Sequence, residues 1–221
     1  MTRVVAIIFA LFVGLPVWAD VQLFKTTDED PELDKISIPI TEKLTASPSR
    51  EATFSYGFKM VLDDENYYIK PTTFMAKSKP DEICNPIEKS LTYRCKEGQP
   101  HVKGCHFLFF DARGKWIGIH TMKINEDIPH YCNAMPAMGV ANRAKNELLV
   151  TMQYFLADGR GAKKVSELGF NWIRMTTLFR VKAINGKIEV EQDDSCLGNP
   201  NQIDTISKAR KQLKRCASVR K

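Results

Sequence analysis

The chain has 221 residues, of which 43% are hydrophobic, and a formal net charge of +6 at pH 7. This length suits one domain, and this apolar content can bury a substantial core, which excludes a fold that depends on disulfide bridges alone. The charge is uneven: residues 20–50 hold seven acids against four bases, whereas residues 205–221 hold seven bases and no acid.

Residues 1–19 have the pattern of a secretory signal peptide. Arg3 supplies the positive start, residues 4–13 are apolar, and small residues lead to a cleavage site after Ala19. The apolar run is too short to span a bilayer of about 30 Å, so no transmembrane anchor is expected. The sequence predicts a periplasmic or secreted protein that begins at Asp20 and has lost the charge of Arg3.

The chain contains six cysteines: Cys84, Cys95, Cys105, Cys132, Cys196 and Cys216. In an exported chain, an even number of cysteines predicts disulfides, because the compartment is oxidising. Pairing of sequence neighbours is chosen because each bridge closes a compact local unit: Cys84–Cys95, Cys105–Cys132 and Cys196–Cys216. Each bridge is expected to contribute about 2–4 kcal/mol. A metal site is the alternative, but the sequence has no CxxC pair.

Residues 20–50 are expected to form an acidic, extended N-terminal segment, followed by a single disulfide-stabilised domain over residues 51–221. Within the domain, residues 53–72 read as two apolar runs separated by a polar turn, which predicts a first hairpin. Residues 77–103 contain three prolines, two cysteines and little periodicity. They predict a long surface loop, and loops of that length are uncommon unless they are functional.

A central hairpin is predicted at residues 105–124. Residues 107–110 are apolar without a break, which predicts a strand buried on both faces. Residues 111–114 have the chemistry of a turn. Four residues of the return strand alternate and are expected to share one face: Trp116, Gly118, His120 and Met122. His120 could line a ligand pocket there, although a histidine hydrogen-bonded at the edge of the core is the commoner outcome.

Residues 125–139 are the most suggestive stretch for chemistry. His130, Met135 and Met138 offer soft ligands of the kind that hold copper. Their order does not match the Cys…His…Met spacing of blue-copper proteins, Cys132 is expected to be bridged, and Met often fills irregular gaps in a core. We therefore expect a loop over the core, and neither a metal site nor a cofactor.

The C-terminal part predicts a strand that begins near Leu148, a hairpin over residues 170–192 and a helix over residues 202–215. Asn185 and Gly186, between alternating residues, are the preferred pair for a type I′ turn. On the helix, three apolar side chains turn inward: Ile203, Ile206 and Leu213. The expected fold is α+β, with mainly antiparallel hairpins forming one sheet or sandwich that the helix closes.

The last helix also carries a basic face. Lys208, Lys211 and Arg215 lie three or four residues apart, with Lys214 beside them, while Arg210 falls on the apolar side. Such a face either aids solubility or docks an acidic partner protein or anionic envelope polymer. We predict the second role for these four residues, Arg210 excluded, and no nucleic-acid partner is expected.

No catalytic motif accompanies the four histidines, because the sequence has no GxSxG elbow, HExxH motif or phosphate-binding glycine loop. The sequence therefore predicts an exported binding or interaction protein without evident catalytic machinery, rather than an enzyme. Two alternatives stay open. One is an envelope hydrolase whose site carries no known motif, and the other is a copper-handling protein that uses His130, Met135 and Met138.

Overall fold

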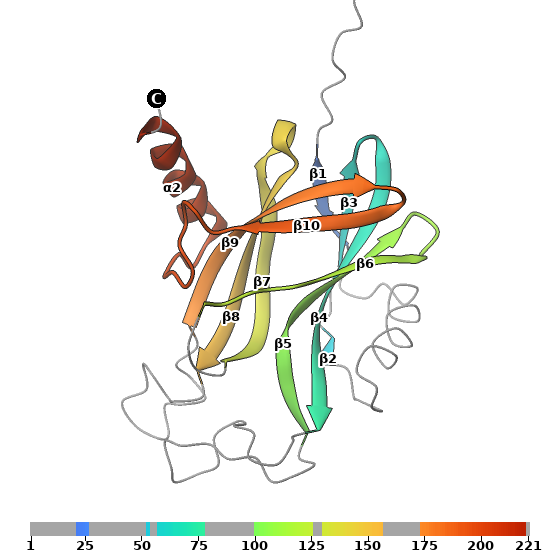
Figure 1. The fold of residues 1–221 in the computed structure, drawn as a ribbon, viewed down its shortest axis with the longest axis horizontal. Coiled ribbons are helices and arrows are strands. Elements are labelled where there is room, and N and C mark those ends of the chain that lie inside the picture. The colour runs from blue at the N-terminus through green and yellow to red at the C-terminus, as the bar shows by residue number, and fades with distance from the viewer. Residues whose placement is uncertain are drawn as a thin grey trace, which may run out of the picture.

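The computed structural model describes residues 21–26, 52–53, 57–77, 100–125, 130–156 and 173–219. This part of the chain contains two antiparallel sheets and a C-terminal helix (Figure 1). The predicted α+β class with mainly antiparallel strands is therefore confirmed. The signal peptide, most of the acidic segment and the Cys84–Cys95 pair lie outside the described residues.

The first sheet has the strand order β1–β3–β4–β5–β6, with β2 paired to β4. Its strands are β1 (Gln22–Lys25), β2 (Ala52–Thr53), β3 (Phe58–Leu62), β4 (Glu65–Lys77), β5 (Pro100–Asp111) and β6 (Trp116–Thr121). The second sheet has the order β10–β9–β8–β7. It contains β7 (His130–Asn142), β8 (Glu147–Leu156), β9 (Ile173–Ile184) and β10 (Lys187–Asp193). The 3-10 helix η1 (Arg143–Lys145) joins β7 to β8.

Turn chemistry places the hairpins where the sequence predicts them. Asn185 and Gly186 have φ angles of 53° and 71° between β9 and β10, which are the positive values that a type I′ turn requires. Asp63 and Asp64 have φ angles of 54° and 62° between β3 and β4. Aspartate is among the few side chains that tolerate this region, so the acidic turn is conformational rather than a sign of chemistry.

The core lies between the two sheets. Phe107 and Phe109 of β5 belong to it, whereas Leu108 and Phe110 form a separate cluster on the outer face, which is turned away from the second sheet. All four are at most 1% exposed, as predicted for a strand buried on both faces. Phe107 meets Phe179 of β9 edge to face, with ring centroids 5.2 Å apart, so this contact joins the sheets.

Two of the predicted disulfides form among the described residues. Cys105–Cys132 joins β5 to β7 across the core, with the Cα atoms 5.2 Å apart. Cys196–Cys216 joins the chain after β10 to the C-terminal helix, with the Cα atoms 6.0 Å apart. The pairing of sequence neighbours is confirmed for these two bridges.

Strand β6 breaks the alternation expected of it. The register of β5 with β6 shifts between Phe109 and Phe110, which leaves Ile117 as the extra residue of a β-bulge. Trp116 therefore packs in the outer cluster, whereas His120 turns into the core. The prediction that Trp116 and His120 share one face is wrong, because it assumed an unbroken ladder.

The stretch predicted as a loop over the core is largely strand. Residues 130–142 form β7, an edge strand of the second sheet, whose pairing with β8 contains three register shifts. The prediction for residues 125–139 is wrong because bulges interrupt the alternation by which a strand is recognised. Likewise, β5 already begins at Pro100, inside the predicted loop of residues 77–103, and residues 78–99 lie outside the described residues.

Helix α2 (Ile206–Val219) is the predicted C-terminal helix, and it starts at residue 206 rather than 202. Thr205 acts as its N-cap, because its hydroxyl oxygen accepts a hydrogen bond from the backbone N–H of Lys208 at 3.3 Å. The predicted inner residues pack on the second sheet around buried Ala209: Ile203, Ile206 and Leu213. In the part of the chain that is described, no helix has the length and apolar character needed to cross a bilayer.

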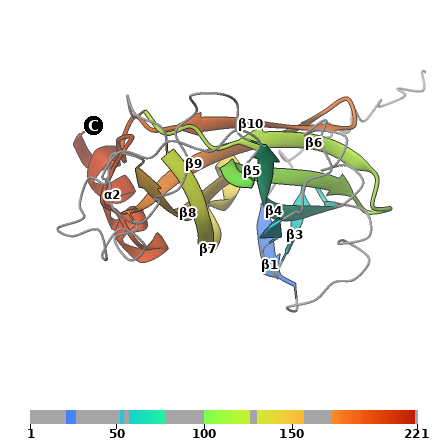
Figure 2. The same cartoon turned by 90° about the horizontal axis from the view of Figure 1, so that it is seen from below.

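The two sheets meet where β6 runs beside β10 (Figures 1 and 2). A Cβ atom on Gly118 would lie only 2.8 Å from the carbonyl oxygen of Ile188, so the backbones approach too closely for a side chain. Polar contacts extend this junction beyond the strands. The backbone N–H of Lys123 donates to Gln192 at 3.0 Å, and its carbonyl accepts from the side-chain amides of Gln192 and Asn199 at 2.9 Å.

Substitution Gly118→Ala is expected to lower the free energy of unfolding by about 1–3 kcal/mol, because the added methyl must displace the backbone of β10. Urea denaturation would measure the loss. Gly139→Ala is the matched control, since its Cβ would meet a side-chain methyl, Cγ2 of Ile206, at 3.2 Å rather than the backbone. The control should lose less than about 1 kcal/mol. Equal losses of unfolding free energy in the two variants would contradict this prediction. They would show that the backbones of β6 and β10 move apart as easily as a side chain shifts.

Candidate functional site

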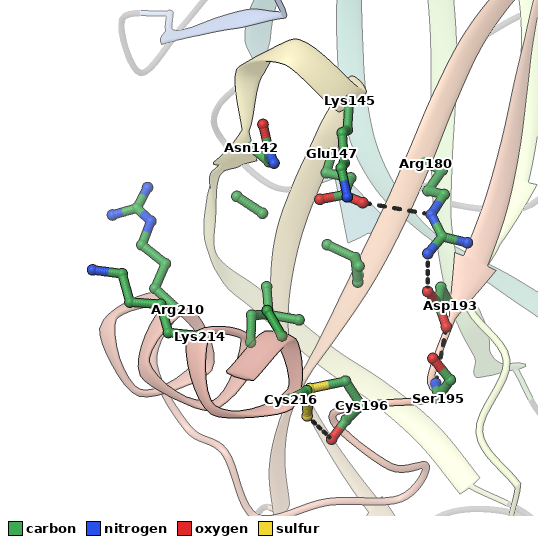
Figure 3. A pocket seen from close by; sticks show the side chains of 14 residues that line it. Asn142, Lys145, Glu147, Arg180, Asp193, Ser195, Cys196, Arg210, Lys214 and Cys216 are labelled. Atoms are coloured by element: carbon green, nitrogen blue, oxygen red, sulfur yellow. Dashed lines mark hydrogen bonds and ion pairs between the residues drawn. A yellow bond between two sulfur atoms is a disulfide. The ribbon is translucent and has the colours of Figure 1, made fainter. Parts of the chain in front are cut away.

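A cleft of about 430 Å³ lies between α2 and the second sheet, and we call it the α2 cleft (Figure 3). Its walls come from the β7–β8 turn, β9, the end of β10 and one side of α2. Leu178 and Leu213 give it an apolar floor, and the Cys196–Cys216 bridge closes one end. The cleft therefore depends on how α2 is fastened to the sheet.

Arg180 of β9 holds the carboxylates of the α2 cleft. Its Nε lies 3.5 Å from Glu147 Oε1, its Nη1 lies 3.5 Å from Glu191 Oε1, and its Nη2 pairs with Asp193. Asp193 also accepts a hydrogen bond from the backbone N–H of Ser195 at 2.9 Å. Glu147 is only 8% exposed, so its carboxylate needs this charged partner. Glu147 and Asp193, the acids that line the cleft, are thus engaged in ion pairs with Arg180.

Three further cations line the α2 cleft: Lys145 near the β7–β8 turn, and Arg210 and Lys214 on α2 (Figure 3). Among the described residues, neither Lys145 nor Lys214 makes an ion pair. Arg210 instead donates from Nε and Nη2 to the carbonyl oxygen of Val140, at 3.1 and 2.6 Å. This bond explains why an arginine occupies the side of α2 that the sequence pattern marks as apolar.

The structure separates the four residues predicted to bind a partner. Lys208 forms an ion pair with Asp204 at 2.8 Å, an acid that lies just before the basic stretch. Lys211 is exposed and lies outside the α2 cleft, whereas Lys214 lines it. Arg215 lines a separate depression of about 310 Å³. Lys214 is therefore the member of the set that lines the same cleft as Lys145, a cation from outside the helix.

A second cleft, of about 450 Å³, lies between β1 and β7, and we call it the β1–β7 cleft. These two strands are edge strands of different sheets. Three basic residues line it and no acidic one does: Lys25, Arg143 and Arg210. Arg210 borders both clefts, so they are neighbours near the end of β7.

Sequence reasoning missed Lys145 and Arg143, although both are visible in the sequence. They flank the β7–β8 turn, and basic residues in a surface turn are too common to be a signal by themselves. Arg143 shares the β1–β7 cleft with Arg210, and Lys145 shares the α2 cleft with Arg210 and Lys214. Both placements depend on how α2 docks, which no local pattern contains. The sequence signal that could have found them is the occurrence of a basic turn and a basic helix in the same chain, which would predict a shared basic site.

The residues considered for copper have different surroundings. Met135 is 2% exposed in the core between the sheets, whereas Met138 packs at the edge of that core and lines the β1–β7 cleft. The side chain of His130 lies outside what the structure describes. Within the described residues, no group of three His, Cys, Asp or Glu side chains is placed to hold a metal ion. Met135 fills the core, which is the common role of methionine.

His120 lies at the edge of the core and lines neither cleft. Its ring meets the ring of Phe179 edge to face, with centroids 4.7 Å apart. Burial lowers its pKa to about 4, although the neighbouring Gln192 amide opposes this shift. The ring is therefore neutral at pH 7. No described residue hydrogen-bonds its buried Nε2.

No protein-family model, curated protein or solved structure matches the chain. The chemistry of the clefts therefore rests on their own residues. Lysine ammonium groups above an apolar floor attract carboxylates and accept neighbouring apolar groups. No histidine or free thiol lines the α2 cleft as the structure describes it, and the acids there are held by Arg180. The arrangement therefore offers cationic and apolar contacts to a ligand.

The pKa of His120 makes stability depend on pH. Its folded value of about 4 lies below the ordinary 6.5, so between these values the unfolded chain binds more protons. Stability is therefore greatest above about pH 6.5 and falls as the pH drops toward about 4, by about 1–3 kcal/mol after allowance for solvent screening. Urea denaturation across this range should show that His120→Phe removes part of the slope. An identical slope in the variant would contradict this origin.

Substitution Met135→Ala is expected to destabilise the fold by about 2–5 kcal/mol, because it leaves a cavity in the core. Thermal and urea denaturation would measure this loss. Met138→Ala, at the partly exposed edge, should cost less. If purified protein instead held copper stoichiometrically against a competing chelator and lost it on Met135→Ala, the methionine would be a ligand.

Proposed function

We propose that the chain is an exported interaction protein that binds an acidic segment of a partner protein in the α2 cleft. The observation that carries this proposal is that Lys145 and Lys214, from separate elements, line the same cleft without ion pairs to described residues. Leu178 and Leu213 lie in the same cleft and can accept apolar side chains of the partner. Attraction between the two charged surfaces would speed association and fix orientation.

Export is supported by the signal-peptide pattern of residues 1–19 and by two disulfides that suit an oxidising compartment. We infer a periplasmic or secreted location from these features together. The anionic envelope polymer considered as an alternative partner presents charge without apolar side chains. The apolar floor of the α2 cleft favours a protein segment, in which both occur.

The proposal predicts that the double variant Lys145→Glu/Lys214→Glu loses affinity for an acidic peptide. The probe is a fluorescent glutamate-rich peptide with interspersed leucines, followed by fluorescence anisotropy. The loss should be at least about tenfold at about 0.1 M salt and much smaller near 1 M, where the Debye length is about 3 Å.

The matched control is Lys187→Glu/Lys211→Glu, which changes the net charge equally at exposed positions outside the α2 cleft. It should retain most of the affinity. Equal losses in the two double variants would mean that net charge, rather than the cleft, attracts the peptide. A pull-down from envelope extract with wild-type and cleft-variant protein would then identify the natural partner.

A further inference from the structure

Strand β7 has one paired edge and one open edge. It pairs with β8, and its other edge faces β1 across the β1–β7 cleft. Between Ala137 and Val140 the pairing with β8 is regular, from Ala137 opposite Thr151 to Val140 opposite Leu148. This part of β7 is therefore an ordinary strand with a defined direction for each backbone group.

Arg210 reveals which backbone groups of β7 point away from β8. It binds the carbonyl oxygen of Val140 from outside the sheet, at 3.1 Å through Nε and 2.6 Å through Nη2. Residues two apart in a strand direct their backbone groups to the same edge, so the N–H and C=O of Met138 also point outward. No described residue hydrogen-bonds these groups of Met138. Arg210 thus occupies one position of a neighbouring strand, and the next position is open.

The surroundings of this edge define the kind of peptide that fits. Leu23 and Phe58 line the β1–β7 cleft on the side of the first sheet, and Arg143 and Arg210 line it on the side of β7 and α2. Its volume is about 450 Å³, and none of its lining residues is acidic. An added strand would place alternate side chains on opposite faces, so apolar residues should alternate with acidic ones.

We infer that an extended peptide of alternating apolar and acidic residues binds the edge of β7 by strand addition, pairing its backbone with Met138. Main-chain hydrogen bonds give affinity in this mode, and alternate side chains give specificity. The inference rests on the proposed function in that the partner is acidic. It concerns a different cleft and a different kind of contact, so the two can be tested apart.

The test uses the mature chain and a fluorescein-labelled peptide of alternating glutamate and valine, followed by fluorescence anisotropy. Met138→Pro removes the outward N–H, and an edge strand tolerates proline because no ladder bond is lost. It should weaken binding at least about tenfold, whereas Met138→Ala keeps the N–H and should change affinity less than about threefold. Circular dichroism would confirm that both variants fold.

A second comparison needs no variant. The same peptide with N-methyl groups on alternate residues keeps its charges and side chains but cannot pair along one edge. Wild-type protein should bind it at least about tenfold more weakly than the parent peptide. Equal affinity for both peptides, or equal binding by Met138→Pro and Met138→Ala, would overturn strand addition. The glutamate-rich peptide used for the α2 cleft should bind the Met138→Pro variant with unchanged affinity. Failure of strand addition would therefore be distinguishable from failure of the proposed function.

Discussion

The close approach of β6 to β10 at Gly118 determines how the two sheets are arranged. These strands end the two strand orders on one side, and Gly118 leaves no room for a Cβ atom beside the Ile188 carbonyl. With one pair of edges joined, Phe107 and Phe179 meet in the core between the sheets. The strands at the other ends, β1 and β7, remain separated by a cleft. The edge of β7 is thus left open because the sheets come together at their opposite edges, β6 and β10.

Helix α2 gives the basic surface fixed positions. Its N-cap, its buried Ala209, its bond from Arg210 to β7 and its disulfide fasten it along its length. Side chains that rise from a fastened element lose less freedom when they bind a ligand, so less affinity is lost to ordering. The Arg180 network acts similarly, because it keeps Glu147 and Asp193 engaged within the sheet. Lys145 and Lys214 of the α2 cleft therefore remain available for the ligand that we propose.

Features governed by neighbouring residues were predictable from the sequence. The Asn185–Gly186 turn, the strand around Phe107 and two disulfides follow from local chemistry. The bulge at Ile117 was not predictable from the sequence. An extra residue reverses the alternation of side chains, and that alternation is the only basis for predicting which face of the sheet a side chain occupies. The candidate site was predicted only at Lys214. Its other members are brought together by the docking of α2, whose geometry depends on contacts distant in sequence.

The Cys196–Cys216 bridge lies in the wall of the α2 cleft, so the cleft is completed by a bond that only an oxidising compartment provides. A newly synthesised chain in a reducing cytoplasm would carry the same lysines on a helix that is less firmly held. Its cations would not yet be positioned against β7 and β8. If the chain is exported as we propose, its competence to bind would arise only after the bridge has formed outside the cytoplasm.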